Sequence, residues 1–81
     1  MQQSEVLKKL QEVFDSTFLQ SVVVRPDLSA RDVEEWDSLA HVSLILAVEE
    51  AFGVQFRVGE VEATKNVGEL ADLIIKRKSE G

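Results

Sequence analysis

The sequence predicts an all-α fold, a small four-helix bundle with three main helices, a short third helix and a long first loop. Apolar residues recur at three- and four-residue spacing over residues 4–19, over residues 38–52 and again after Asn66, which is the pattern of helices. Hydrophobic residues make up 44% of the chain, enough to form a core. A length of 81 residues predicts a single domain, residues 1–81.

The first helix is expected from Ser4 to about Leu19. Ser4 is its predicted N-cap, because serine is preferred at that position. The apolar residues fall on one stripe, so one face of the helix should be buried. That stripe comprises Val6, Leu7, Leu10, Val13, Phe14 and Phe18.

Residues 20–36 are expected to form a long connection. The β-branched run at 22–24 favours a strand, but an isolated strand would have no partner, so none is predicted. Ser29 and Asp32, three residues apart, are related to a capping box and predict one helical turn. A loop of this length in so small a domain is often functional.

The second helix is expected from Ser38 to Phe52 and should stop at Gly53, because glycine readily follows a helix in the left-handed conformation. Its apolar residues cover nearly all sides and leave only a narrow polar strip. Such a helix is predicted to lie in the middle of the bundle. Leu46 should therefore be buried, and its replacement by alanine should cost about 2–5 kcal/mol of stability.

A short third helix is expected at residues 59–64, anchored by apolar residues around it. The last helix should begin at Asn66, which forms a capping-box-like pair with Glu69. Basic residues in its last turn suit the helix dipole. The anchors of the short helix are Val54, Phe56, Val58 and Val61. The apolar stripe of the last helix comprises Val67, Leu70, Ala71 and Ile74, with Leu73 beside it. The basic residues of its last turn are Lys76, Arg77 and Lys78.

Acidic residues are concentrated in the middle of the chain. The net charge is −6, and residues 27–62 alone hold nine acids against two bases, on both sides of Ser38 and its helix. This surface should repel nucleic acid, so no nucleic acid partner is expected. It should attract basic protein surfaces, although an acidic surface also simply raises solubility.

The composition disfavours several classes of site and location. Without cysteine there is no disulfide, thiolate metal site or cysteine nucleophile, and one histidine cannot form a His-rich metal site, so no metal is expected. No apolar run approaches the roughly 20 residues of a membrane span. Residues 1–12 lack the apolar core of a signal peptide, so we expect a cytoplasmic protein.

Ser38 permits three interpretations. It is a helix cap, since Asp37 and Ser38 are both preferred N-cap residues. It is a nucleophile served by Asp37 and His41, although a single helical turn supplies little of the base, orienting group and oxyanion hole that such a site needs. Or it carries an anionic group, because the first N–H groups and the dipole of a helix favour a phosphate.

The stretch "WDSLAHVSLILAVEEAFGVQF" resembles the acyl carrier protein family. The D-S-L motif, the "EEAFG" end of the helix and the later "NVGELADLI" all match the family's pattern, as do the long first loop and the short third helix. The resemblance implies a non-enzymatic carrier with no catalytic residues. It implies that a carrier protein synthase, a phosphopantetheinyl transferase, moves 4′-phosphopantetheine from coenzyme A onto Ser38, and that this group carries acyl intermediates as thioesters.

The same resemblance implies roles for other residues. Asp37 corresponds to the acid that the synthase recognises, and Leu39 to a leucine that docks partner enzymes. Glu49 and Glu50 correspond to part of the acidic recognition stripe. Expected partners are acyl ligases or synthases with basic docking surfaces, acting on a monomer. A tunnel for the acyl chain would be lined by Val42, Leu46, Val61 and Ile74.

Some positions depart from the family's usual pattern. Ala40, His41 and Ser43 stand where polar and acidic residues are common, so the recognition stripe is thinned. Trp36 replaces a small residue, and it either packs on the loop or shapes partner contacts. We interpret the chain as a specialised, freestanding bacterial carrier for fatty acid, polyketide or other biosynthetic enzymes. The alternative is a small acidic interaction module in which Ser38 is only a helix cap.

Overall fold

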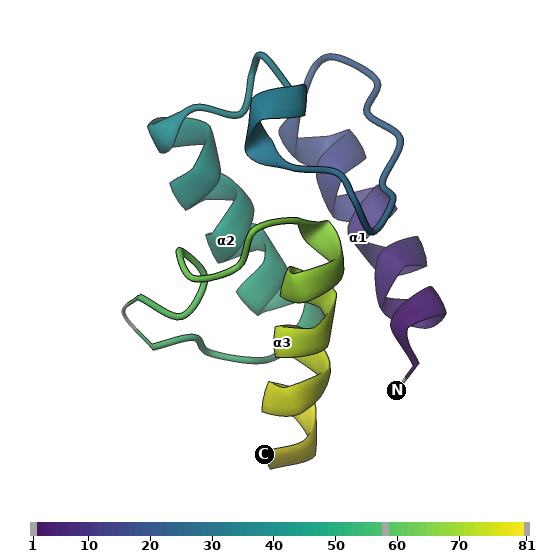
Figure 1. Cartoon of the computed structure of the whole chain (residues 1–81), viewed down its shortest axis with the longest axis vertical. Coiled ribbons are helices and arrows are strands. Elements are labelled where there is room, and N and C mark those ends of the chain that lie inside the picture. The colour runs from purple at the N-terminus through teal and green to yellow at the C-terminus, as the bar shows by residue number, and fades with distance from the viewer. Residues whose placement is uncertain (1, 58, 81) are drawn as a thin grey trace.

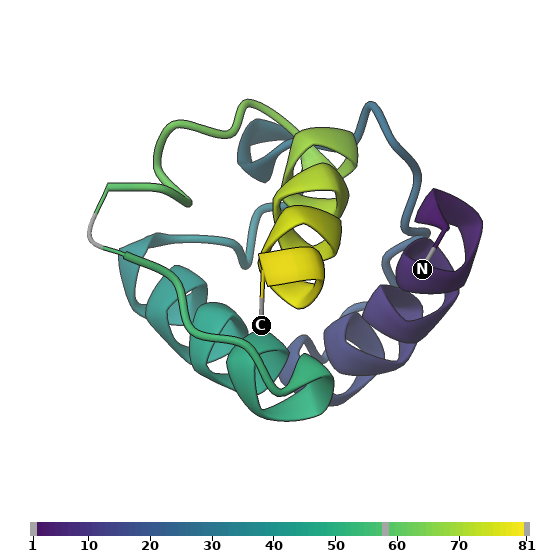
Figure 2. The same ribbon diagram turned by 90° about the horizontal axis from the view of Figure 1, so that it is seen from below.

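The computed structural model describes residues 2–57 and 59–80. These residues form three α-helices, α1 (Gln3–Thr17), α2 (Ser38–Phe52) and α3 (Val67–Glu80), and one 3₁₀ turn, η1 (Ala30–Asp32), with no strand among them. The predicted all-α class and the three main helices are confirmed. α1 packs against both α2 and α3 (Figure 1). Seen from below, α3 lies opposite the junction of the other two helices (Figure 2).

One continuous core joins the three helices and the first loop. Phe14 and Leu10 from α1, Leu44 from α2 and Ile74 from α3 are completely buried. Each such side chain stabilises the fold by roughly 1.5–3 kcal/mol relative to an exposed one. The predicted stripe of α1 faces this core, apart from Leu7, which is half-buried at its edge.

The start of α1 corrects the predicted cap. The N-cap is Gln2, and Ser4 lies exposed inside the first turn. The Glu5 side chain accepts a hydrogen bond from the backbone N–H of Gln2 at 3.2 Å, which satisfies a donor that the helix leaves free. This contact draws the start of the helix toward the N-terminus.

The long first loop is held in place by polar side chains. Gln11 of α1 donates to the carbonyl of Val22 at 2.6 Å and accepts from the N–H of Val24 at 2.9 Å. The β-branched run thus finds its hydrogen bonds on a side chain, and no strand forms. Within η1, Asp32 accepts from the backbone N–H and hydroxyl of Ser29, so the predicted helical turn is confirmed.

The loop also packs closely on the start of α3. The N–H groups of Val67 and Gly68 donate to the carbonyls of Leu28 and Pro26, both at 2.8 Å. A Cβ atom at residue 68 would lie 2.9 Å from the Pro26 oxygen. Glycine is needed there because any side chain would push the loop away from the helix.

The predicted central position of α2 is wrong. Leu44 is completely buried, but Leu39, Val42 and Leu46 are 82%, 58% and 59% exposed. The chain has too few elements to surround a helix, since small domains bury a smaller fraction of their surface. Leu46→Ala should therefore cause only a small loss of stability and not the large one predicted, because an exposed side chain contributes little to the core.

The predicted short helix at 59–64 is also absent, so the four-helix count is not confirmed. Residues 59–63 form successive turns, with the Ala63 N–H donating to Gly59 O at 3.2 Å. Gly59 has φ +88°, a left-handed conformation that interrupts a helix. Val54 and Val61 still anchor the segment as buried residues. Phe56 is half-buried, and the fourth predicted anchor, Val58, lies outside the described residues.

Candidate functional site

The N-terminus of α2 presents an uncommitted serine. Asp37 is the N-cap, and its Oδ1 accepts from the N–H of Ala40 at 2.9 Å. Ser38 is the first helical residue and is exposed, and its hydroxyl makes no hydrogen bond within the described residues. Ser38 is therefore not the helix cap that the alternative interpretation required.

The geometry around this serine does not form a hydrolytic triad. His41 Nδ1 accepts from the indole N–H of Trp36 at 3.0 Å, and the Asp37 carboxylate caps the helix. No side-chain hydrogen bond in the described parts of the chain links the imidazole of His41 to Ser38 or to the Asp37 carboxylate. A nucleophile without an adjacent base and an orienting group is not activated.

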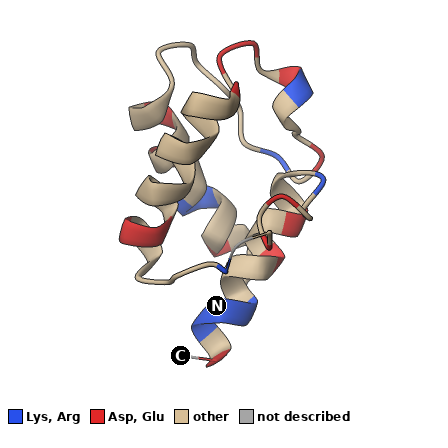
Figure 3. Cartoon of the chain, turned by 90° about the vertical axis from the view of Figure 1, so that its left-hand side faces the viewer, with Lys and Arg blue, Asp and Glu red and all other residues tan. Residues whose placement is uncertain are grey.

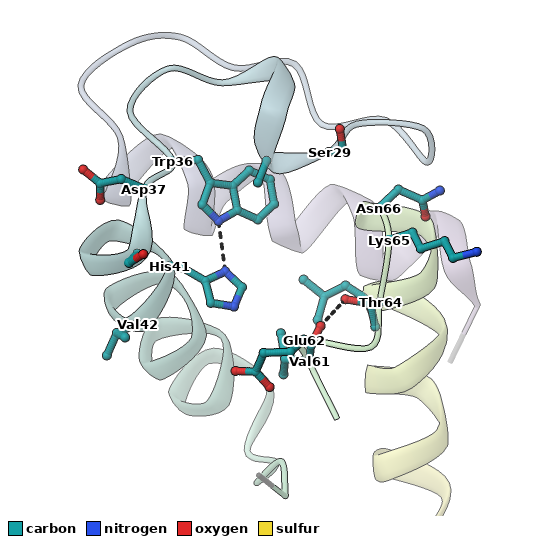
Figure 4. Close-up of a pocket in the computed structure, with 13 residues that line it drawn as sticks. Ser29, Trp36, Asp37, His41, Val42, Val61, Glu62, Thr64, Lys65 and Asn66 are labelled. Carbon is teal, nitrogen blue, oxygen red and sulfur yellow. Dashed lines mark hydrogen bonds between the residues drawn. The ribbon is translucent and has the colours of Figure 1, made fainter. Parts of the chain in front are cut away.

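A cavity of about 640 Å³ adjoins Ser38 on the side between α2 and the start of α3 (Figure 4). Residues 61–66 form its far wall, and η1 contributes to one end. The lining combines apolar and polar side chains from Ser29, Ala30, Trp36, Asp37, Ser38, His41, Val42, Val61, Glu62, Thr64, Lys65, Asn66 and Leu70.

An aromatic cluster supports one wall of this cavity. The Trp36 ring meets Phe14 edge-on at 5.4 Å between centroids and lies 6.1 Å from Phe18. On its other side it lies edge to edge with His41, with ring centroids 6.2 Å apart and an interplanar angle of 19°. Trp36 therefore fixes His41 to the core. Its aromatic contacts are with the end of α1 rather than with the loop, which was one of the two predicted roles.

The far wall of the cavity is tied to α3 by an ion pair. Arg77 and Glu60 form a salt bridge, and the Glu60 carboxylate also accepts from the N–H of Arg57 at 2.6 Å. The hydrogen bond from Arg77 and then that from Arg57 lower the pKa of Glu60 below its ordinary value. This contact holds the turns that precede Val61 against the helix.

Two of the four residues predicted to line an acyl tunnel meet at this cavity. Val42 lies at its rim and Val61 on its far wall. Leu46 lines a separate recess near Glu50 and Arg57, and Ile74 is completely buried in the core. Sequence reasoning did not assign Trp36, His41 or Thr64 to this site, because residues from three segments converge there without any common spacing.

The residues expected to meet partners lie on the outer face of α2. Asp37 and Glu50 are exposed at its two ends, and Figure 3 shows these acidic ends in red with an uncharged stretch between them. Leu39 projects from this stretch. Glu49 is half-buried and accepts from the N–H of Phe56 at 2.9 Å, so it also secures the segment that follows the helix.

Two further properties concern metals and membranes. Within residues 2–57 and 59–80, no group of three or more His, Cys, Asp or Glu side chains is placed to hold a metal ion. None of the helices described has the length and apolar character that crossing a bilayer requires.

The structure is thus a small helical domain with an exposed serine at a capped helix N-terminus and a cavity beside it. The chain matches the family model "Phosphopantetheine attachment site" over residues 4–74. It is 35% identical to an acyl carrier protein from Rubrobacter xylanophilus over 98% of this chain and 99% of that protein. An acyl carrier protein from Thermosynechococcus vestitus is 37% identical over 91% and 93%, respectively. The chain belongs to the acyl carrier protein family.

A solved structure agrees with the fold. The solution NMR structure of a holo acyl carrier protein from Geobacter metallireducens superposes with a TM-score of 0.75 and 36% identity, covering 96% of this chain and 86% of that one. The chain is thus a phosphopantetheine-bearing acyl carrier. Membership of this family implies a phosphopantetheinyl transferase and acyl-handling enzymes as partners in general.

Proposed function

We propose that Ser38 is the residue to which 4′-phosphopantetheine is attached. Its hydroxyl is exposed and free of internal hydrogen bonds, whereas the neighbouring Asp37 carboxylate is occupied by the cap. This difference between two adjacent polar residues is the observation that carries the proposal.

The helix end suits the charge of a phosphodiester. The Asp37 side chain accepts a hydrogen bond from the N–H of Ala40, and its backbone carbonyl accepts one from the N–H of His41 at 2.8 Å. The N–H groups of Ser38 and Leu39 have no partner inside the helix, and the positive end of the dipole lies there. An anion on the Ser38 oxygen is therefore stabilised. When bound, the group supplies a terminal thiol that holds an acyl group as a thioester, which explains a carrier without cysteine.

The adjoining cavity suits the attached group. Val42, Val61 and Leu70 provide apolar lining, and burial of each methylene contributes roughly 0.8 kcal/mol. We propose that this cavity shelters part of the arm or its acyl chain. Leu46 and Ile74 have no place in that role, because neither lines the cavity.

We further propose that partners dock on the outer face of α2. An exposed apolar stretch, Leu39, Val42 and Leu46, lies between acidic residues at both helix ends. A matching enzyme surface would combine an apolar centre with a basic rim, since complementary charge speeds encounter. Asp37 and Glu50 would contribute the acidic contacts, and Glu49 a weaker one because it is committed to Phe56. Such partners include acyl ligases or synthases. We do not expect nucleic acid among them.

In this role the chain acts as a cytoplasmic, monomeric carrier and does not itself catalyse a reaction. We propose that residues 1–81 act as one functional domain. The thinned acidic stripe favours a specialised biosynthetic system, such as polyketide synthesis, over general fatty acid synthesis.

A test uses a carrier protein synthase, coenzyme A and intact-mass measurement. The native protein should gain the mass of one phosphopantetheine, and Ser38→Ala should gain none. Ser43→Ala, which removes another exposed serine of α2, should be modified like the native protein. If the native protein stays unmodified with several synthases, the assignment of Ser38 as the attachment residue is overturned.

A further inference from the structure

His41 holds a hydrogen-bond donor in a fixed place within the cavity. Because Nδ1 accepts the indole hydrogen of Trp36 at 3.0 Å, the neutral imidazole must carry its proton on Nε2. The two rings are nearly coplanar, with an interplanar angle of 19°, so this hydrogen bond fixes the ring plane as well. Figure 4 shows the ring extending from α2 toward Val61 and Thr64, with its second nitrogen on the side away from the indole.

Two hydroxyl groups of the cavity are already used. The Thr64 hydroxyl donates to Val61 O at 2.5 Å, and the Ser29 hydroxyl donates to Asp32 at 3.2 Å. The side chains of Lys65 and Asn66 extend away from the imidazole in Figure 4. Nε2–H of His41 makes no hydrogen bond within the described residues, so its donor capacity is open to a bound group.

We propose that His41 is a specificity-determining residue, which donates from Nε2–H to a neutral carbonyl or hydroxyl oxygen of the group carried on Ser38. The inference rests on the proposed attachment at Ser38. Residues three apart on a helix are neighbours, about 5–6 Å between Cβ atoms, so a tethered group passes within reach of the ring. The carboxylate of Glu62 lines the same cavity and would repel a carboxylate on the bound group, so the acceptor oxygen should be neutral. The oxygen belongs either to the arm or to an oxygenated acyl group.

The experiment follows the imidazole of His41, the single histidine of the chain, by ¹⁵N NMR. Four forms are compared: the unmodified protein, the phosphopantetheine form, and that form carrying either butanoyl or 3-oxobutanoyl. The unmodified protein should show the Nε2–H tautomer. On formation of the hydrogen bond, exchange of this proton with water should slow about tenfold or more, as expected for about 1.4 kcal/mol.

The four forms distinguish the source of the oxygen. Slowing in the phosphopantetheine form identifies an oxygen of the arm, and slowing only with 3-oxobutanoyl identifies the acyl group. Either result supports the proposal. Unchanged exchange in all loaded forms, with the mass gain confirmed, overturns the proposal and leaves attachment at Ser38 standing. No mass gain in the native protein overturns both.

Two variants test the origin of the donor. Trp36→Phe removes the indole N–H and should yield a mixture of the two imidazole tautomers in the unmodified protein. A pure Nε2–H tautomer in this variant would contradict the role given to Trp36. In His41→Phe, a ¹³C-labelled 3-carbonyl of 3-oxobutanoyl, or the arm carbonyls, should lose the downfield shift seen in the native protein. An unchanged shift would overturn the proposal.

Discussion

The two faces of α2 both carry large apolar residues but differ in burial. Leu44 is completely buried between α1 and α3, whereas Leu46, two residues later, is 59% exposed. Val48 and Phe52 continue the buried face, and Leu39 and Val42 continue the exposed one. The same side-chain type thus supplies stability on one face and is left exposed to solvent on the other, where we propose that partners dock.

This difference shows that apolar character does not by itself assign a residue to the core. Isolated exposed apolar residues are common on protein surfaces, but two leucines and a valine on one stretch between acidic helix ends form a surface suited to binding. The following variants test how completely the two faces are separated, from the largest expected effect to the smallest.

Leu44→Ala should lower the free energy of unfolding by about 2–5 kcal/mol, because it removes a completely buried side chain and leaves a cavity. Equilibrium denaturation with urea measures this loss. The matched variant Leu46→Ala should change stability by less than about 0.5 kcal/mol. Equal losses for the two leucines would mean that the faces are not distinct.

Leu39→Ala should act on partners and leave the fold intact. Removing an exposed apolar contact should lower kcat/KM for phosphopantetheine transfer by about tenfold, as for a moderate interface contact of about 1.4 kcal/mol. Initial rates with a carrier protein synthase measure the effect, and Ser43→Ala serves as the control. A large loss of thermal stability in Leu39→Ala would assign Leu39 to the core instead.

Asp37 is the N-cap of α2 and, in our proposal, also a contact for the synthase. Two substitutions separate these roles. Asp37→Ala should cost about 0.5–2 kcal/mol because the N–H of Ala40 loses its acceptor. Asp37→Asn keeps a capping oxygen and should retain stability, yet slow transfer by the synthase through the lost charge. If Asn restores both properties, charge at residue 37 has no part in recognition.

The ion pair between Glu60 and Arg77 should produce the smallest effect. The pKa of Glu60 is lowered in the folded protein, mainly by the Arg77 hydrogen bond. Its stabilising contribution is therefore present above the unfolded pKa and is lost as the pH falls through the folded value. Denaturation from pH 7 down to about pH 3 should show native and Glu60→Gln proteins converging at the acid end. A constant difference in stability would exclude this linkage.

Local sequence signals placed the helices well. The apolar spacing of α1, Gly53 after α2, and Ser29 with Asp32 at η1 each depend on contacts within a few residues, so they are readable without the fold. The same reasoning missed the N-cap of α1, because Glu5 and Gln2 satisfy each other better than Ser4 does. It also predicted a short helix that begins at Gly59, whose left-handed conformation does not fit a helix.

The sequence by itself determined the all-α class, the bounds of α2 and the resemblance that points to Ser38, because these depend on short-range pattern and motif. Only the tertiary structure decided which face of α2 is buried, since that depends on where α1 and α3 pack. It alone also brought Trp36, His41 and Val61 around one cavity. Such convergence has no sequence spacing, because side chains from separate segments meet only when the whole chain has folded.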